Sequence, residues 1–205
     1  MNLYDRYVLP HLIDCACGMK AIQHERAALI PQACGHVLEI GMGTGRNLPF
    51  YDAQKISSLC GLDPAAQMHP LARKRARRAG LAVELLNLPA ERIPAEDASF
   101  DTVVTTFTLC TIPDAAQALR EMRRVLKPGG HLLFCEHGRA PDESVRRWQD
   151  RLTPLWKPLA GGCHLNRDVA ALLHEGGFSA PQMQQRYLPG PRPMTYVYSG
   201  SAVGI

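Results

Sequence analysis

Five short apolar runs alternate with segments of helical period along the first two thirds of this 205-residue chain. Short apolar runs are typical of strands that are buried on both faces, and helical connections are typical of strands that run parallel. The pattern therefore predicts an α/β fold with a doubly wound, mostly parallel sheet. The runs cover residues 37–40, 58–62, 82–86, 101–106 and 131–135.

The last part of the chain adds two strand-like stretches, 178–188 and 194–203, with the proline-stiffened "LPGPRPM" between them. A short connection joins antiparallel neighbours, so we expect a C-terminal antiparallel hairpin that brings the sheet to seven strands. The apolar pattern predicts one or two helices in residues 1–33 and a further helical segment in residues 141–176. The length is suited to one hydrophobic core, so we expect a single domain over 1–205.

The net charge of +4 is small, and acidic and basic residues are mixed along most of the chain, so the charge does not predict binding to nucleic acid. The basic run "RKRARR" at 73–78 lies in a segment whose apolar positions fit one helical face, which predicts a solvated basic face. No apolar run is long enough to cross a bilayer, and the first residues lack the pattern of a signal peptide. We therefore expect a cytoplasmic protein without integral membrane association.

Seven cysteines are scattered through strand-like and helix-like segments and include no C-x-x-C pair. An odd number with this distribution favours reduced thiols over a disulfide framework. Cys15 and Cys17 have a single residue between them, which is poor spacing for structural zinc. The sequence therefore predicts no metal site.

A glycine turn follows the first apolar run, in the segment "EIGMGTGRN" at 39–47. A dinucleotide site would have the pattern G-x-G-x-x-G, but here the sixth position is Arg46, whose bulk disfavours a close pyrophosphate. Glu39 lies two residues before the first glycine, where a carboxylate suits a ligand that carries an ammonium group. The turn therefore indicates a nucleotide-like ligand that is cationic or zwitterionic at this end.

A second acid, Asp63 in "CGLDP", ends the second run about 20 residues after the glycines. A carboxylate in this place can accept hydrogen bonds from both hydroxyls of a ribose. The alternative is a helix N-cap before Pro64. After the third run, "LPAERIPAEDASFD" offers the Ala90 backbone and Glu91 to the edge of an adenine.

These segments together resemble the class I methyltransferases that use S-adenosylmethionine. "VLEIGMGTG" is similar to their first motif, "GLDP" to the second, and "LREMRRVLKPGGHLLFCEH" to a later one. The resemblance covers nearly the whole chain and implies a Rossmann-like seven-stranded fold with S-adenosyl-L-methionine as cofactor. The cofactor-binding residues implied in this way are Glu39, Gly41, Gly43, Gly45, Asn47, Asp63, Pro64, Met68, Ala90, Glu91 and Thr106.

The second half of the chain is similar to one branch of these enzymes, the thiol methyltransferases of the methyltransferase-like group, in a bacterial form without the membrane anchor of the animal proteins. The similar segments are "TLCTIPD", "WQDRLTPLWKPLAGGCHLNRD" and "YLPGPRPMTYVYSGSA". The resemblance implies S-methylation of a small-molecule thiol, and we expect a monomer or homodimer. C-methylation of a quinone and N-methylation of a phospholipid remain alternatives, because those relatives share the cofactor motifs. A non-catalytic cofactor-binding protein is disfavoured by the intact Glu39 and Asp63.

Methyl transfer to sulfur needs a thiolate held in line with the methyl group. A thiol with a pKa of about 8.5 is ionised to a few per cent at pH 7, so a dedicated base is dispensable. If a base takes part, His137 after the fifth run is the first choice and His164 the second; alternatively, Glu136 and His137 only hydrogen-bond the loop backbone.

Residues 1–33 would form a lid, and residues 141–176 would line the acceptor pocket. The expected pocket residues are Tyr4, Tyr7, Leu109, Glu136, Trp148, Trp156 and Cys163.

Overall fold

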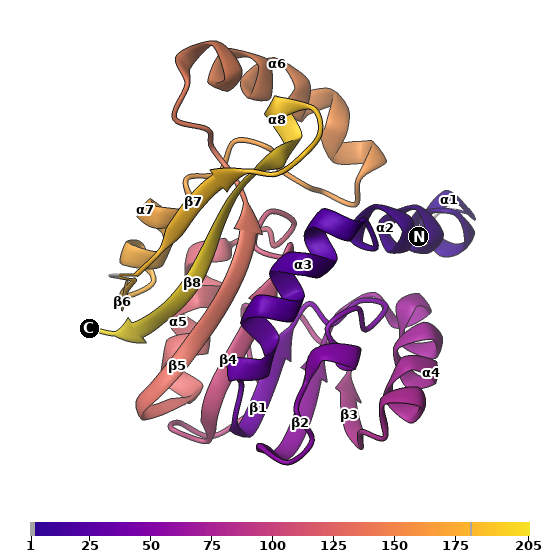
Figure 1. The fold of residues 1–205 in the computed structure, drawn as a ribbon, viewed down its shortest axis with the longest axis vertical. Coiled ribbons are helices and arrows are strands. Elements are labelled where there is room, and N and C mark those ends of the chain that lie inside the picture. Colours follow the sequence, from indigo (N-terminus) through magenta and orange to yellow (C-terminus); the bar gives the residue numbers. More distant parts are fainter. Residues whose placement is uncertain (1–2, 181) are drawn as a thin grey trace.

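The computed structural model describes residues 3–180 and 182–205, so residues 1 and 2 of the expected lid and residue 181 of the expected strand 178–188 lie outside it. The described residues form an α/β fold around a single path of paired strands, in the order β3-β2-β1-β4-β5-β8-β6, with β7 beside β8 (Figure 1). The strands are β1 Gly35–Ile40, β2 Ile56–Leu62, β3 Val83–Leu86, β4 Phe100–Thr106, β5 Leu126–His137, β6 Phe178–Ser179, β7 Gln184–Tyr187 and β8 Tyr196–Gly204.

Strands β1 to β5 run parallel to their neighbours, and β8 pairs antiparallel with β5, β6 and β7. The predicted Rossmann-like sheet and its C-terminal antiparallel hairpin are confirmed. The number of strands in the described part is eight rather than seven, because the stretch 178–188 is divided. A turn closed by the hydrogen bond from Met183 N to Ala180 O (3.2 Å) separates β6 from β7, and the two strands pair with different parts of β8.

The strand order reverses between β1 and β4, since the chain runs outward from β1 to β3 and then crosses back to β4. Connections on the two sides of such a switch point diverge, which leaves a crevice at the carboxyl ends of the two strands. In Figure 1 the helices α1, α2 and α6 lie beyond these strand ends. The topology therefore places a ligand site between β1 and β4.

Helices cover both faces of the sheet. In Figure 1, α3 crosses the near face, α5 lies behind it, and α4 flanks the β3 edge. The N-terminal segment forms three α-helices where one or two were expected. The helices are α1 Leu3–Tyr7, α2 Leu9–Cys17, α3 Lys20–Leu29, α4 His69–Ala79, α5 Ala115–Val125, α6 Glu143–Leu159, α7 Val169–Glu175 and α8 Arg192–Thr195, with 3-10 turns η1 Ile30–Gln32, η2 Leu48–Phe50 and η3 Ala66–Met68.

Two apolar clusters pack on the opposite faces of the sheet. On one face Leu119 and Met122 of α5 are buried with Phe134 of β5; on the other, Ile30 and Ala72 are buried with strand residues. A fully buried side chain of this size stabilises the fold by about 1.5–3 kcal/mol relative to an exposed one. The N-terminus of α5 is fixed by Asp114, whose carboxylate accepts a hydrogen bond of 2.9 Å from Gln117 N. Both faces are thus occupied by packing, and the carboxyl edge is the part of the sheet that remains for a ligand.

Among the described residues, none of the helices combines the length and the apolar character that crossing a bilayer requires.

Candidate active site

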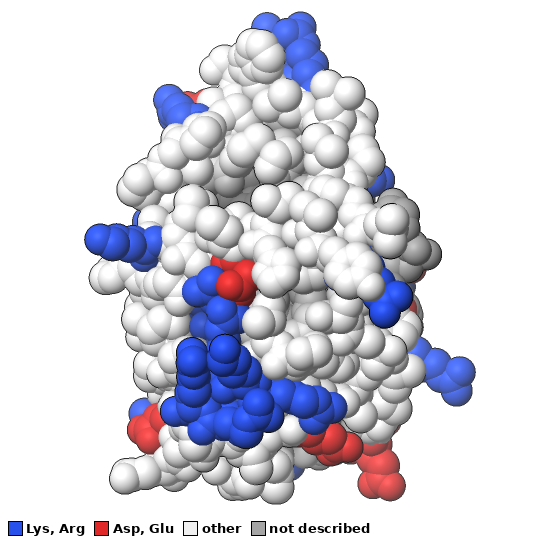
Figure 2. Space-filling model, turned by 90° about the vertical axis from the view of Figure 1, so that its right-hand side faces the viewer, with Lys and Arg blue, Asp and Glu red and all other residues white. Residues whose placement is uncertain are grey.

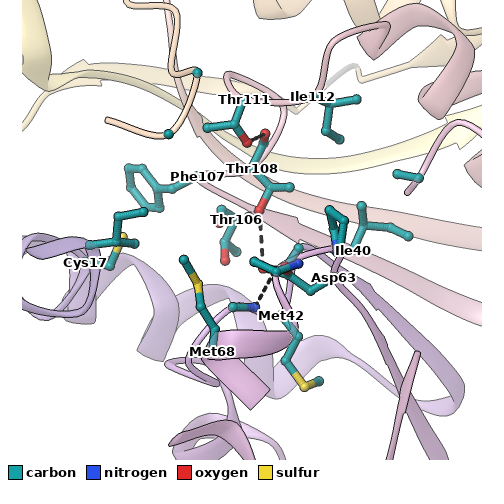
Figure 3. Close-up of a pocket in the computed structure, with 18 of the residues that line it drawn as sticks. Cys17, Ile40, Met42, Asp63, Met68, Thr106, Phe107, Thr108, Thr111 and Ile112 are labelled. Atoms are coloured by element: carbon teal, nitrogen blue, oxygen red, sulfur yellow. Dashed lines mark hydrogen bonds between the residues drawn. The ribbon is translucent and has the colours of Figure 1, made fainter. Parts of the chain in front are cut away.

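A cavity of about 1420 Å³ opens at the carboxyl ends of β1, β2 and β4 (Figure 3). Its wall includes the glycine turn, the segment after β2, the loop 106–113 and the loop after α6. The N-terminal helices contribute Leu9, Ile13 and Cys17. Pockets for a single drug-sized ligand measure roughly 300–1,000 Å³, so this cavity has room for two small molecules side by side.

The glycine turn has the left-handed backbone that glycine tolerates, with φ of 68° at Gly41, 53° at Gly43 and 79° at Gly45. A Cβ on Gly41 would lie 2.2 Å from Cγ2 of Thr108, so only glycine fits where the turn meets the loop after β4. Gly41 and Gly43 line the cavity. Gly45 does not, because it packs against Leu48, whose Cδ1 would be 2.6 Å from an added Cβ.

Asp63 ties the end of β2 to the glycine turn. Its carboxylate accepts hydrogen bonds of 2.7 Å from both Gly43 N and Ala65 N, and it lines the cavity (Figure 3). Burial raises the pKa of Asp63, and these two N–H groups lower it in part. Ala65 itself is the N-cap residue of η3, so the carboxylate supports the start of this turn and also faces the ligand space.

Glu39 is buried at the end of β1 with its carboxylate in a polar network. One oxygen accepts a hydrogen bond of 3.0 Å from Asn47 Nδ2 and the other accepts one of 2.7 Å from the Tyr51 hydroxyl. Burial raises the pKa of Glu39 to about 7, against the hydrogen bonds and the charge of Arg26, which lower it. Asn47 also donates to Thr106 Oγ1 (3.0 Å) and lies behind the cavity wall, so it positions Glu39 and Thr106.

Arg26 of α3 is, with Tyr51, a residue of this network that sequence reasoning missed. Its side chain is buried and lines the cavity; Nη1 donates to Thr106 Oγ1 (2.6 Å) and to Asn47 Oδ1, and the guanidinium lies over the Phe107 ring. Its Nε is buried and has no hydrogen-bond partner in the described part of the chain. The site therefore presents a carboxylate and a guanidinium to one ligand, which suits a zwitterion.

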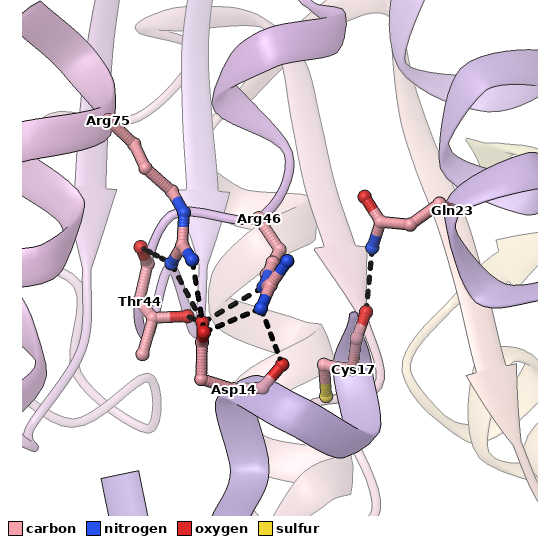
Figure 4. A network of polar contacts seen from close by, with 6 residues as sticks. All are labelled: Asp14, Cys17, Gln23, Thr44, Arg46 and Arg75. Carbon is pink, nitrogen blue, oxygen red and sulfur yellow. Dashed lines mark hydrogen bonds and ion pairs between the residues drawn. The ribbon is translucent and has the colours of Figure 1, made fainter. Parts of the chain in front are cut away.

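A salt-bridge cluster holds α2 against the glycine turn (Figure 4). Asp14 accepts hydrogen bonds from Arg46 Nε (2.9 Å), Arg75 Nη1 (2.7 Å) and Thr44 Oγ1 (2.5 Å). Burial alone would raise the pKa of Asp14, but the hydrogen bonds from Arg75 and Arg46 outweigh it and hold the pKa well below its usual range. Arg46, at the position that disfavoured a pyrophosphate, thus joins two elements of the cavity wall.

The expected basic face of α4 needs one correction. Arg75 is only partly exposed because it is paired with Asp14, whereas Arg73, Lys74, Arg77 and Arg78 are exposed as predicted. Basic side chains gather in the lower part of the face shown in Figure 2.

The expected cofactor residues are mostly brought together by the fold. Those that line the cavity are Glu39, Gly41, Gly43, Asp63, Pro64, Met68, Ala90, Glu91 and Thr106. Gly45 and Asn47 lie behind the wall, where they shape the turn and the polar network.

Of the two expected base residues, the structure places only His164 in the cavity wall. Its Nδ1 lies 3.0 Å from the carbonyl oxygen of Cys110, so Nδ1 carries the hydrogen and Nε2 is the nitrogen that can accept a proton in the neutral ring. His137 lies behind the wall, with Nε2 3.1 Å from Sγ of Cys163 and its ring stacked on Phe107. Burial lowers the pKa of His137, but the hydrogen bond with Cys163 and the negative charges of Cys163 and Glu136 together outweigh it, and the net shift is upward.

Glu136 is fully buried and holds the loop that follows β4. Its carboxylate accepts hydrogen bonds from Thr108 N (2.8 Å), Leu109 N (3.1 Å) and Thr105 Oγ1 (2.8 Å). For Glu136, this arrangement agrees with the alternative in which its side chain only hydrogen-bonds the backbone of the loop. Leu109 is buried in the core cluster rather than in the cavity wall.

The remaining expected pocket residues do not line the cavity. Trp148 is 55% exposed and Tyr7 is 57% exposed, and Tyr4 donates a hydrogen bond of 2.7 Å to the carbonyl of Leu159. Trp156 and Cys163 pack with Cys110 behind the wall. The segment 141–176 nevertheless contributes to the cavity, through Thr153, Pro154, Lys157, Pro158 and the loop 161–166.

Comparison with known proteins gives a consistent result. Residues 38–134 match the profile of a methyltransferase domain family. The chain is 36% identical to human thiol S-methyltransferase TMT1B over 75% of this chain and 64% of that protein, and 35% identical to the mouse protein over 77% and 68%. The match thus spans slightly less than two thirds of the human protein. A putative methyltransferase from Bacillus halodurans has the same fold, with a TM-score of 0.67 and 18% identity over 89% of this chain and 94% of that one.

Proposed function

The chain belongs to the S-adenosylmethionine-dependent methyltransferases, and from this premise we propose that it methylates the sulfur of a small-molecule thiol. The observation that carries the donor half of this proposal is the pair of opposite charges, Glu39 and Arg26, at the glycine turn. The acceptor half rests on the similarity to thiol S-methyltransferases and on the side chains that line the rest of the cavity.

The residues of the cavity fit the cofactor part by part. The carboxylate of Glu39 suits the ammonium of its methionine part. Arg26, whose buried Nε finds no hydrogen-bond partner within 3–180 and 182–205, suits the carboxylate of the same part. Asp63 is suited to the ribose hydroxyls, and Ala90 and Glu91 to the adenine. When bound, the cofactor supplies an electrophilic methyl group on a sulfonium.

The acceptor side of the cavity combines apolar walls with basic groups. Phe107, Ile112 and Pro154 provide apolar surface, while Lys157 and His164 are the basic side chains there. Positive charge near a thiol favours the thiolate form, which is the nucleophile. An apolar wall with the ammonium group of Lys157 beside it therefore suits a hydrophobic thiol better than an amine, which would have to lose a proton to react.

We assign to His164 the removal of the proton from the thiol. Because its Nδ1–H is committed to the Cys110 carbonyl, Nε2 carries the free lone pair of the neutral ring. The ionised fraction of the thiol can react without a base, and a base in this position increases the rate by ionising the rest.

The experiment that tests the proposal presents the purified protein with the cofactor and with three matched acceptors, an alkyl or aryl thiol, a quinol and an amine. We expect an S-methyl product and S-adenosylhomocysteine in equal amounts, measured by mass spectrometry. A methyl product from the quinol or the amine alone would exclude the thiol assignment. Absence of any product, with cofactor binding intact by calorimetry, would exclude the enzyme activity for this panel.

A further inference from the structure

Three side chains that are well suited to metal binding meet behind the acceptor side of the cavity. Cys110 follows β4, His137 ends β5, and Cys163 lies in the loop after α6. One ligand atom from each of the three residues lies within 4.8 Å of the other two. His137 Nε2 is 3.1 Å from Cys163 Sγ. Segments far apart in the sequence thus place two sulfurs and one imidazole nitrogen around one point.

The fold holds these three residues in place by contacts that do not involve the ligand atoms. The backbone N of His164 donates a hydrogen bond of 2.9 Å to the Cys110 carbonyl, which links the Cys163 loop to the loop after β4. Glu136 holds the start of that same loop through Leu109 N. Phe107 stacks on the His137 ring. The ligand set is therefore preorganised, which lowers the entropy cost of binding an ion.

The chemistry of the ligand set selects the ion. Two thiolates and a neutral imidazole carry a charge of −2, so a divalent ion gives a neutral centre, as a buried site requires. Soft sulfur and imidazole ligands favour zinc and exclude magnesium and calcium, which take oxygen ligands. Cys110 and Cys163 are 3% and 7% exposed, so both sulfur ligands are largely withdrawn from bulk solvent. We propose that Cys110, His137 and Cys163 bind one Zn²⁺ ion.

A neighbouring side chain supports this assignment independently. Trp156 packs against the cluster that contains Cys110, Cys163 and Leu165, and its Nε1 is buried without a hydrogen-bond partner among the residues that the structure describes. A thiolate bound to zinc retains lone pairs and commonly accepts a hydrogen bond from outside the ligand set. The indole N–H is a donor of the right kind in the same cluster.

The ion would stabilise the two loops that line the acceptor side of the cavity. Thr111 follows the Cys110 ligand, and Gly162 and His164 flank the Cys163 ligand; all three line the cavity. Zinc would cross-link the two loops that carry them and fix the distance between their cavity faces. With three protein ligands, its fourth position stays open to water or to an exogenous ligand.

Metal analysis of the intact purified protein is the first test. After expression with added zinc and gel filtration, we expect about one zinc per chain. Metal-free protein titrated with Co²⁺ should show sulfur-to-cobalt charge transfer and the visible bands of tetrahedral cobalt. Substoichiometric zinc, below about 0.1 per chain, together with no cobalt spectrum would overturn the proposal, whatever the activity of the protein.

Variants then identify the ligands. Cys110→Ser, Cys163→Ser and His137→Ala should each lose the cobalt spectrum and at least tenfold of the zinc affinity. The matched control is Cys135→Ser, because Cys135 is as buried as the two ligands but belongs to a different apolar cluster. Circular dichroism shows whether each variant folds, and the wild-type titration stands even if one does not. The assignment would be contradicted if Cys135→Ser lost as much zinc affinity as the ligand variants. It would also be contradicted if all three ligand variants kept the cobalt spectrum and the zinc affinity.

Discussion

Arg26 and Glu39 are joined through the amide of one side chain, since Asn47 accepts a hydrogen bond from the guanidinium and donates one of 3.0 Å to the carboxylate. The two charges come from α3 and from the end of β1, and both line the cavity. A ligand with neighbouring positive and negative groups can pair with each of them without displacing the amide. This relationship makes the charge of Glu39 the most direct test of the donor site.

Replacing Glu39 by Gln keeps the shape of the side chain and removes its negative charge. We expect the cofactor to bind roughly 10- to 100-fold more weakly, because a hydrogen bond to a charged group contributes about 1.5–3 kcal/mol. Isothermal titration calorimetry measures the change. Glu84→Gln, an exposed site on β3 away from the cavity, is the control. Equal affinity of wild type and Glu39→Gln would remove Glu39 from the site.

The pKa of Glu39 predicts how stability changes with pH. Because burial raises it to about 7, the folded protein holds a proton between pH 4.5 and 7 that the unfolded chain has lost. The contribution of Glu39 to stability therefore falls as pH rises through this window and is constant above it. The ligand-free wild type should thus lose stability relative to Glu39→Gln from pH 5 to 7.5, measured by urea unfolding. Parallel curves for the two proteins would contradict the raised pKa.

The affinity for the cofactor should rise with pH over the same range in which the stability of the ligand-free protein falls. Below pH 7 the carboxylate of Glu39 becomes neutral, so binding should weaken as pH falls from 8 to 6. The Glu39→Gln variant should show a flat profile. Calorimetry at each pH gives both curves, and a wild-type profile as flat as that of the variant would speak against Glu39 as the titrating group.

Asp63→Ala should weaken cofactor binding by at least an order of magnitude, because the ribose partner is lost and Gly43 N loses its acceptor. Asp63→Asn keeps one carbonyl oxygen and should lose less. The exposed Asp114→Asn changes a helix cap outside this contact and serves as a control for a general loss of stability. If both Asp63 variants bound as tightly as wild type, the ribose assignment would fail.

Asp14→Asn should release α2 from the glycine turn. The carboxylate joins two arginines that are about one quarter exposed or less, so we expect a cost of about 1–3 kcal/mol and faster proteolysis in residues 3–29. Glu143→Gln removes an exposed pair with Arg147 and should cost less than about 0.5 kcal/mol. Urea unfolding and limited trypsin digestion measure the two effects. Equal costs for both variants would show that the Asp14 cluster does not hold the N-terminal helices.

His164→Gln should lower the rate most for thiols of high pKa. A base contributes roughly 10²- to 10⁴-fold when the proton must be removed and little when the thiol is already ionised. The ratio of kcat between wild type and variant should therefore shrink as the thiol pKa falls below the assay pH. His174→Gln, at an exposed site on α7, is the matched control. A ratio that is the same for acidic and weakly acidic thiols would exclude a role in proton removal.

Much of the fold could be predicted because its signals are local. Strands buried on both faces produce continuous apolar runs, and an Asp cap such as Asp114 is a signal confined to one turn of the chain. The glycine turn and Asp63 could also be located, because they follow strands directly. By contrast, the division of 178–188 into β6 and β7 depends on pairing with distant β8, which periodicity does not encode.

The residues missed at the site are those whose role depends on long-range packing. Arg26 has the sequence context of a surface arginine and becomes buried only because α3 crosses the sheet. Trp148 and Trp156 are spaced for one helical side, yet Trp148 is exposed while Trp156 packs on the cysteines. The group of Cys110, His137 and Cys163 has no motif spacing, because each residue comes from a different segment.

The position of β8 has a consequence for how the protein is made. Residues of β5, β6 and β7 all precede β8 in the chain, yet β8 lies between β5 and the other two. During synthesis the edge of β5 must therefore stay without its antiparallel neighbour until residues 196–204 have left the ribosome. An open strand edge is prone to association with other chains. The nascent protein should therefore depend on chaperone protection up to its last strand, long after the glycine turn has been made.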